Sequence, residues 1–316
     1  MSKILIKGGQ IISMDTDIGQ LDQGDILIEN DKIIEIGNLI KNSDAEIVDA
    51  SKMIVMPGLI DSHIHTWQTG IRGIAGNWTM GEYLRGMHAN LATSFKPDDI
   101  FLGNLAGALT QINSGITTIF DWSHNNPTPD HTDAAIDGLF EAGVRAIFGH
   151  GSPKPDPKEG QKHFSEIPHP EHEIKRLREG RLSSDDALVT LAMCILGPHY
   201  STYEVTHQDI LLARKYGLLA SAHMSGGFNR VVPDGIFKMR DDNLLDQKLN
   251  VVHGNDLSDE ELKILIDNGV KMTVTPEVDD ILLKAQQTFQ EIDEVIKGLE
   301  IPREVGMMEI LFKGTV

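Results

Sequence analysis

From residue 54 onward, stretches typical of buried strands alternate with stretches typical of helices, and this alternation limits the possible fold more than any other feature. Strands are expected at seven places: Ile54–Ile60, Ile116–Phe120, Val144–Phe148, Leu188–Met193, Leu218–Ala222, Val251–Val252 and Lys271–Val274. The expected helices include Pro97–Ser114, Asp133–Ala142, Thr206–Tyr216 and a segment that opens with the capping-box residues Ser258 and Glu261. Strands that alternate with helices predict parallel βαβ units. The expected fold is therefore α/β, a TIM-type (β/α)8 barrel that is one strand short at its C-terminal end.

The first 56 residues follow a different pattern and are expected to form a separate, small β-subdomain. Asp25–Glu29 and Lys32–Gly37 are predicted to form a hairpin, because Asn30 and Asp31 supply turn conformations between them. This segment is too small to own a good core, so it is expected to pack on another part of the protein. The expected domains are residues 1–56, a barrel over residues 57–280, and a helical tail of open placement over residues 281–316.

Composition and charge argue against several classes of protein. The chain of 316 residues carries a formal net charge of −19, which disfavours binding to nucleic acid and to an anionic membrane surface. No apolar run reaches the roughly 18 residues of a membrane span, and the first residues are too few and too charged for a signal peptide. Cys194 is the only cysteine, so the chain can form neither an intrachain disulfide nor a cysteine-based zinc cluster. A soluble cytoplasmic protein is expected, with no nucleic-acid or membrane partner.

Two histidines stand at the end of the first expected barrel strand. The stretch from Val55 to Thr66 reads Val-Met-Pro-Gly-Leu-Ile-Asp-Ser-His-Ile-His-Thr. In an extended strand, residues i and i+2 point to the same face, so His63 and His65 present two imidazole nitrogens side by side. Imidazole is a ligand for zinc, iron, copper and nickel. Such a pair also occurs by chance at structural or surface positions, so the pair alone leaves both interpretations open.

Three further histidines lie at or just after the ends of other expected strands. His199 follows the fourth strand, His223 the fifth and His253 the sixth. The carboxyl ends of barrel strands meet at one face, where the active sites of such barrels form. A single histidine after a strand is more often a satisfied polar residue than a ligand. Histidines at or just after the ends of four different strands rarely arise by chance, so together they favour a common site.

A set of imidazoles at a barrel mouth predicts a particular chemistry. Three neutral imidazoles can hold a divalent cation and leave positions open, as catalytic sites do. Such a cation lowers the pKa of bound water towards about 7, and a neighbouring imidazole can transfer protons or polarise the substrate. The expected reaction is hydrolysis of a C–N bond, or of another bond to a leaving group on a carbonyl or electron-poor ring carbon.

The ordered motifs of the chain resemble those of the amidohydrolase superfamily. Pro57–His65 is similar to the opening signature of this superfamily, and later stretches resemble its cytosine deaminase and chlorohydrolase branch, with triazine hydrolases and adenosylhomocysteine-type deaminases. These later stretches are Gly115–Asp121, Gly197–His199, Ser221–His223, and Val252–Gly254 with Leu257–Glu261. The resemblance covers about residues 3–278. It implies a TIM-type barrel flanked by a small β-sandwich subdomain.

The resemblance also implies roles for single residues. One Zn²⁺ or Fe²⁺ would be held by His63, His65 and His223. By the same analogy His253 would act in proton transfer at the metal-bound water, and His199 would contact the substrate. Family members often form dimers or larger oligomers, and a barrel that lacks its last strand exposes edges, so a homo-oligomer is expected.

Two positions depart from the pattern of the family. A glutamate usually stands three residues after the histidine of the fifth strand as a proton shuttle, whereas this chain has Gly226. A metal-binding and base-acting aspartate normally follows the eighth strand, and nothing after Pro276 resembles that segment. The missing glutamate favours a leaving group other than ammonia. The missing aspartate supports the alternative of a non-catalytic barrel, which binds a ligand or assembles with other chains but does not hydrolyse a substrate.

Smaller candidates have two interpretations each. Trp67 either stacks on a planar substrate ring or packs at the barrel rim, and Asp121 either contacts the site or caps a loop. Cys194 stands in apolar company and is expected to be buried and unreactive. The histidines within residues 151–181, namely His163, His169 and His172, are either metal ligands or part of a solvated lid, and the lid is the favoured interpretation.

The sequence therefore predicts a metal-dependent hydrolase that acts on non-peptide C–N bonds. The expected reaction is deamination of a small heterocyclic molecule, nucleobase-, nucleoside- or triazine-like, by metal-activated water. One alternative is hydrolytic removal of chloride or an alkylamine from such a ring. Another is a non-catalytic amidohydrolase-like barrel that lacks the base aspartate.

Overall fold

The structure is a computed structural model that describes residues 2–42, 44–224 and 230–274. Contacts divide the chain into two compact units, Met1–Leu59 and Ile60–Val316. The tail expected at residues 281–316, Gly226, and any eighth strand after Pro276 lie outside the described residues. Among the described residues, every helix is too short or too polar to cross a membrane.

The N-terminal unit is built on one five-stranded sheet. The strands are β1 (Lys3–Ile12), β2 (Gln20–Glu29), β3 (Lys32–Gly37), β4 (Glu46–Asp49) and β5 (Ile54–Val55). Strands β2 and β3 form the predicted antiparallel hairpin, and Asn30 in its turn has φ +57°. Asparagine tolerates this left-handed conformation better than most residues. The core of this unit is small and contains Leu5, Leu27 and Ile40.

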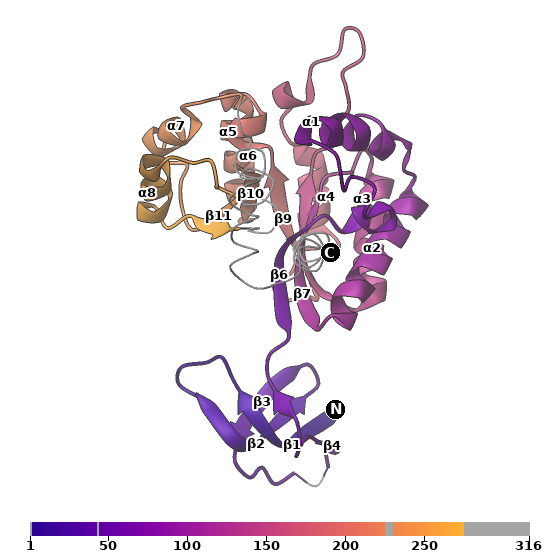
Figure 1. The fold of residues 1–316 in the computed structure, drawn as a ribbon, viewed down its shortest axis with the longest axis vertical. Coiled ribbons are helices and arrows are strands. Elements are labelled where there is room, and N and C mark those ends of the chain that lie inside the picture. The colour runs from indigo at the N-terminus through magenta and orange to yellow at the C-terminus, as the bar shows by residue number, and fades with distance from the viewer. Residues whose placement is uncertain (1, 43, 225–229, 275–316) are drawn as a thin grey trace, which may run out of the picture. The chain divides into compact units, whose positions relative to one another are not determined.

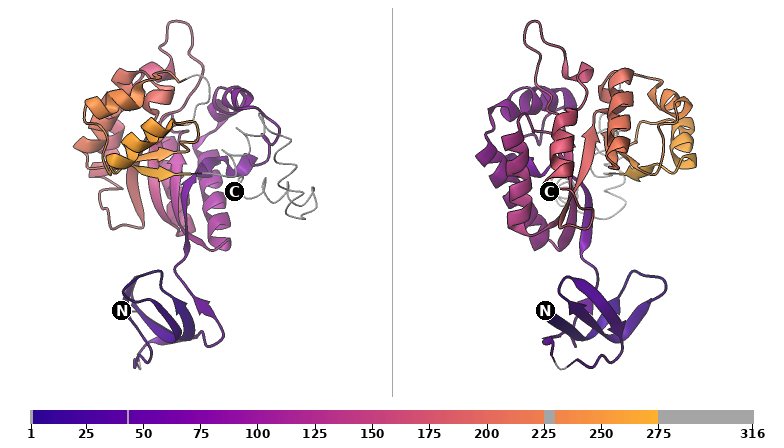
Figure 2. Two further views of the ribbon diagram at one scale, coloured as in Figure 1. Left: turned by 60° about the vertical axis from the view of Figure 1, so that its left-hand side comes forward. Right: turned by 180° about the vertical axis from the view of Figure 1, so that it is seen from behind.

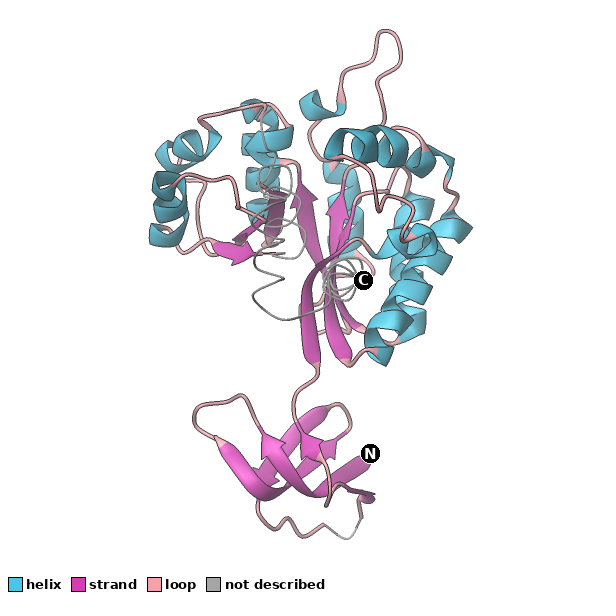
Figure 3. Ribbon diagram, viewed as in Figure 1, coloured by secondary structure: helices cyan, strands magenta, loops and turns pink. Residues whose placement is uncertain are grey.

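The second unit contains a seven-stranded sheet in which the strands follow one another in chain order (Figures 1 and 3). The strands are β6 (Leu59–Ile64), β7 (Ile116–Ser123), β8 (Arg145–Gly151), β9 (Val189–Ile195), β10 (Ala220–His223), β11 (Leu249–Val252) and β12 (Lys271–Thr273). Each neighbouring pair from β7 to β12 is parallel. Sequential parallel strands joined by helices are the arrangement of a TIM-type barrel, which confirms the predicted fold class.

Helices follow most of these strands and pack on the sheet (Figure 2). The α-helices are α1 (Met80–Tyr83), α2 (Pro97–Asn113), α3 (Pro129–Ala142), α4 (Glu171–Glu179), α5 (Gly197–Tyr200), α6 (Tyr203–Lys215), α7 (Gly235–Asp241) and α8 (Asp259–Asp267). Shorter helical turns are η1 (Thr66–Ile71), η2 (Leu84–His88), η3 (Leu91–Ser94) and η4 (Phe164–Glu166). The capping box predicted at Ser258 is present, since the Ser258 hydroxyl accepts from the Glu261 N–H and the Glu261 carboxylate accepts from the Ser258 N–H.

The first predicted barrel strand, Ile54–Ile60, was placed wrongly. Ile54 and Val55 form β5 and pair with β1, whereas the strand of the barrel begins only at Leu59. Pro57 lies between β5 and β6 and has no N–H to donate to a neighbouring strand. The extended stretch therefore divides at Pro57 into two strands. The histidine pair keeps its expected position at the carboxyl end of β6.

Hydrogen bonds between buried side chains connect four strands of the sheet. The indole N–H of Trp122 donates to the Ser221 hydroxyl over 3.3 Å, and the Asn250 amide donates to the same hydroxyl over 3.1 Å. The Thr273 hydroxyl donates to the side-chain amide oxygen of Asn250 over 3.2 Å. These bonds connect β7, β10, β11 and β12, so they set the positions of strands that carry site residues.

Two smaller expectations have different outcomes. Cys194 is buried, as predicted, and Gly149 on β8 leaves room for its sulfur. The loop after β8 is not solvated throughout, because His169 is 5% exposed and bound to the body of the unit. Its backbone N–H donates to Asp209 over 2.8 Å, and its Nε2 lies 2.9 Å from the His150 carbonyl oxygen. The solvated-lid prediction is wrong for this residue, because buried polar partners compensate its desolvation.

Candidate metal centre

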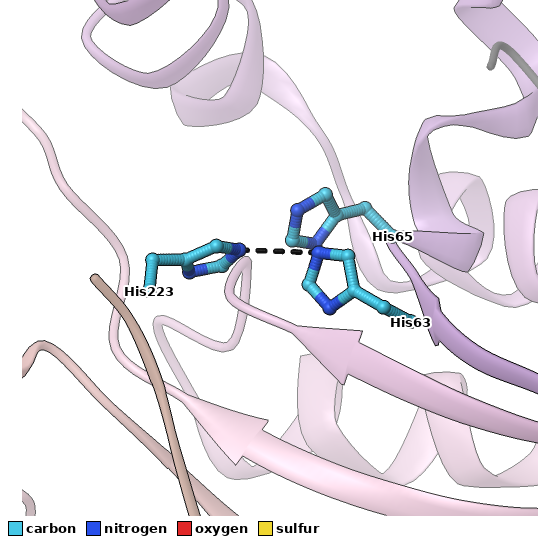
Figure 4. Close-up of side chains that lie close together, drawn as sticks. All are labelled: His63, His65 and His223. Atoms are coloured by element: carbon cyan, nitrogen blue, oxygen red, sulfur yellow. Dashed lines mark hydrogen bonds between the residues drawn. The ribbon is translucent and has the colours of Figure 1, made fainter. Parts of the chain in front are cut away.

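Three histidines from two distant parts of the chain converge at the carboxyl ends of the strands (Figure 4). His63 and His65 stand at the end of β6, and His223 is the last residue of β10. Their ligand atoms all lie within 4.8 Å of one another, and the Nε2 atoms of His63 and His223 are 3.2 Å apart. The structure therefore brings the three predicted metal ligands together.

Hydrogen bonds to neighbouring groups hold the backbone at His63 and the ring of His65 in place. The His63 backbone N–H donates to the Asp61 carboxylate over 3.0 Å, which holds the end of β6. Nδ1 of His65 lies 2.7 Å from the Trp122 carbonyl oxygen. A carbonyl oxygen only accepts, so Nδ1 carries the proton and Nε2 of the neutral ring keeps a free lone pair. Such a hydrogen bond from the other ring nitrogen is typical of metal-binding histidines.

The donor set fits a divalent cation such as zinc. Two nitrogens bound to one tetrahedral zinc at about 2.0–2.1 Å lie about 3.3–3.4 Å apart, close to the 3.2 Å between His63 and His223. The buried Nδ1 of His63 has no hydrogen-bond partner among the described residues. Burial lowers the pKa of His65 to about 3 and also lowers the pKa values of His63 and His223, with their neighbouring imidazoles adding to the effect on those two. All three rings are thus neutral at pH 7, the form that binds metal.

His253 lies beside this triad. Its ring stacks on that of His223 with a centroid distance of 5.2 Å and lies 5.7 Å from that of His63. The backbone at His253 has φ +75°, and its N–H donates to the Thr273 carbonyl oxygen over 2.8 Å. A left-handed conformation is uncommon for a residue other than glycine and is often found at functional sites. The ring of His253 is thus held within reach of the triad.

The other two sequence candidates occupy different surroundings. His199, in α5, is 2% exposed, and its Nδ1 lacks a partner among the described residues. Burial lowers the pKa of His199 to about 4, and the charge of Arg230 adds to this effect. Trp67, in η1, is fully buried, with the Phe95 ring 5.2 Å away edge-on. Within the described part of the chain, no ring contact or hydrogen bond connects either residue directly to the triad.

Four residues near the triad are not predicted from the sequence as part of the site: His88, Trp122, His124 and Lys154. The Trp122 ring lies 4.2 Å from that of His223, and the His124 ring stacks on that of His65 at 4.2 Å. Trp122 and His124 stand at the carboxyl end of β7, the same kind of position that singled out the other histidines. A histidine directly after an expected strand is visible in the sequence, so His124 could have been predicted. His88 lies in a helical segment and Lys154 in a loop, and no sequence pattern marks either residue.

Asp121 caps the site from β7. Its carboxylate accepts from the Thr66 N–H over 3.1 Å and from the Asn104 amide over 2.9 Å. It thereby attaches the turn after His65 to β7 and α2. Burial raises the pKa of Asp121 to about 6. Of the two sequence interpretations, these contacts support the loop-capping one.

The fold and site together define an α/β barrel with a histidine cluster at the carboxyl ends of its strands. Residues 54–298 match the model of the amidohydrolase family, and the chain belongs to this family. This confirms the resemblance on which the sequence interpretation rests.

Curated relatives and solved structures support this assignment. The chain is 32% identical over 151 residues to a 5′-deoxyadenosine deaminase of Methanosarcina acetivorans, covering 48% of this chain and 34% of that one. It is 27% identical over 271 residues to a 5-methylthioadenosine/S-adenosylhomocysteine deaminase of Pyrococcus furiosus, covering 83% and 61%. The zinc-complexed atrazine chlorohydrolase of Arthrobacter aurescens superposes with a TM-score of 0.75 at 23% identity, covering 87% and 66%. The chain thus spans between about a third and two thirds of the length of these proteins.

Proposed function

We propose that this protein is a metal-dependent hydrolase that deaminates an adenosine-like heterocycle. One divalent ion, Zn²⁺ or Fe²⁺, would be held by His63, His65 and His223. The convergence of these three neutral imidazoles at the strand ends carries the proposal. The deaminase names of the curated relatives support the reaction class, and the zinc-bound barrel structures support the metal.

The residues around the triad supply the rest of the proposed chemistry. When bound, the ion would lower the pKa of a water molecule and so make it a nucleophile at neutral pH. We assign proton transfer to His253, because its ring stacks on that of a proposed ligand. His199 has a buried nitrogen without a partner among the described residues, and we assign it to the substrate. For Trp67 we propose a place in the wall of the substrate site, as the partner of His124.

The proposal is tested by measuring metal content and ammonia release on the same preparation. Mass spectrometry of metals is combined with an ammonia assay on 5′-deoxyadenosine, 5′-methylthioadenosine, cytosine and an aminotriazine. We expect about one bound ion per chain and turnover of a purine nucleoside. His223→Asn should lose both, and the exposed His172→Asn should lose neither. A metal-free protein without turnover of any of these compounds would refute the proposal and favour a non-catalytic barrel.

A second candidate function is removal of a different leaving group from a similar ring. Gly226 stands where the resembling branch has a proton-donating glutamate, and a departing chloride needs less protonation than ammonia does. The same preparation is therefore assayed for chloride release from a chlorotriazine and for amine release from its N-alkyl analogue. Faster release of chloride than of ammonia would favour this second function.

A further inference from the structure

A buried lysine lies beside the histidine cluster. Lys154 follows β8, so it stands at the same carboxyl edge of the sheet as the triad. Its side chain is buried, and its Nζ lies 5.3 Å from the centroid of the Trp122 indole. The same indole lies 4.2 Å from the ring of His223 and 5.7 Å from that of His65. One aromatic ring thus contacts both the ammonium group and the proposed metal ligands.

The charge of Lys154 has no anionic partner within the described residues. No hydrogen bond or ion pair connects its ammonium group to another residue in that part of the chain. Its electrostatic neighbours are the thiol of Cys194, whose pKa burial raises and which is therefore uncharged at neutral pH, and the imidazoles of His65, His88 and His124. A buried charge without a counter-charge is unfavourable, and a cation–π contact recovers only part of the lost hydration. A divalent ion on the triad would add further positive charge to the same space.

The buried carboxylate of Asp121, on β7, is already engaged. One oxygen of the Asp121 carboxylate accepts from the Thr66 N–H and the other from the Asn104 amide, and no ion pair with Lys154 is found within the described residues. Lys154 is not needed to hold Trp122 either. The Trp122 indole donates to Ser221, and its carbonyl oxygen accepts from His65. Neither a structural ion pair nor support of the indole accounts for a lysine here.

We propose that Lys154 is a specificity-determining residue that binds an anionic substituent of the substrate, a carboxylate in the first instance. The substrate class would be an amino-substituted heteroaromatic compound that carries such a group, in preference to a neutral nucleoside. This inference rests on the proposed function for the identity of the ring, but the anion site itself follows from the contacts of Lys154. A charge-assisted hydrogen bond supplied by the ligand would satisfy the ammonium group that the described protein residues leave without one.

The test compares two matched pairs of compounds that differ in the distance between ring and carboxylate. One pair is 5′-deoxyadenosine and adenosine 5′-carboxylate, and the other is 9-methyladenine and adenine-9-acetate. Dissociation constants come from isothermal titration calorimetry on the metal-loaded full chain, with kcat/KM measured alongside. The variants are Lys154→Met, Lys154→Arg and, as a matched control in the same loop, the exposed Lys158→Met.

We expect the wild type to bind the carboxylate of at least one pair more tightly than its neutral partner. Lys154→Met should weaken binding of that carboxylate by about ten- to hundredfold, the range for a hydrogen bond to a charged group, and leave the neutral compound unchanged. Lys154→Arg should retain most of the preference, and Lys158→Met should match the wild type. Equal binding within both pairs by the wild type, or equal losses for both compounds in Lys154→Met, would overturn the inference.

The two proposals fail in different ways. Selective binding of a carboxylate without ammonia release would leave the Lys154 site standing and count against deamination of these compounds. Ammonia release, with no effect of Lys154→Met on the preference between paired compounds, would support deamination and refute the anion site at Lys154.

Discussion

The indole N–H of Trp67 donates a hydrogen bond of 3.0 Å to Nδ1 of His124. An indole only donates, so Nδ1 of His124 is unprotonated and its neutral ring carries the proton on Nε2. The His124 ring stacks on that of His65, one of the proposed metal ligands. A buried tryptophan thereby fixes the tautomer of an imidazole that supports the site.

This relationship predicts the effect of Trp67→Phe. The substitution keeps an aromatic ring but leaves the buried Nδ1 of His124 without its donor. The free energy of unfolding should fall by about 1–3 kcal/mol, the cost of an unsatisfied buried acceptor, with a smaller contribution from lost volume. Urea unfolding measures this change. The control is Trp78→Phe, which removes an indole that is only partly buried and makes no side-chain hydrogen bond within the described residues, and it should cost clearly less.

Metal removal should change stability as well as activity. An ion bound to the native state stabilises it in proportion to RT ln(1 + [L]/Kd), so a chelator should lower the melting temperature of the wild type. His63→Asn and His65→Asn each remove one of the three proposed ligands. Their melting temperatures should be insensitive to both chelator and added Zn²⁺, while His172→Asn behaves like the wild type. An equal response of all these proteins to chelator would place the ion elsewhere.

Asp121→Asn should loosen the turn that follows His65. The carboxylate accepts two hydrogen bonds, from the Thr66 N–H and the Asn104 amide. An asparagine can satisfy only one of them with its oxygen, so its NH₂ group would face a donor. We expect a loss of about 1–3 kcal/mol in stability and a weaker affinity for Zn²⁺. Calorimetric titration with Zn²⁺ checks the second part, and the exposed Asp130→Asn is the control. Unchanged Zn²⁺ affinity would show that Asp121 supports the fold without positioning His65.

The buried imidazoles should make the metal-free protein sensitive to acid. Burial lowers the pKa of His199 to about 4 and of His65 to about 3, and it lowers that of His150 well below 6.5. Such a group binds fewer protons in the native state than in the unfolded state, so the free energy of unfolding falls as the pH drops below about 6.5. Burial raises the pKa of Asp121 to about 6 and also raises that of Asp61, and these two groups act in the opposite direction above the ordinary carboxyl value of 3.8. The imidazoles with lowered pKa values outnumber them.

His150→Gln isolates one of these groups away from the triad. It removes one titrating imidazole, so stability should fall less steeply with acid, by about 1.4 kcal/mol per pH unit below 6.5. Urea unfolding in EDTA at pH 7.5, 6.5, 5.5 and 5.0 measures both slopes, with His172→Gln as the exposed control. A slope as steep as that of the wild type would show that His150 does not titrate with unfolding.

The sequence by itself determined the order of elements and showed which histidines stand at the ends of strands. Alternating strand and helix patterns identified the barrel, because periodicity and helix-end signals are local properties of the chain. The histidines at strand ends were visible for the same reason, since parallel strands bring their carboxyl ends to one edge whatever their distance in the chain. His63 and His223 are 160 positions apart, yet both were predicted from the position of each in its own strand.

Only the tertiary structure decided what surrounds these histidines. Local pattern placed the strand before His63 too early, because the pairing of Ile54 and Val55 with β1 depends on residues far away in the chain. The support of His65 by the Trp122 carbonyl, the tautomer of His124 and the position of Lys154 over the Trp122 ring likewise arise from the packing of neighbouring strands and loops. Side-chain contacts of this kind depend on the register and distance between strands, which no local periodicity encodes.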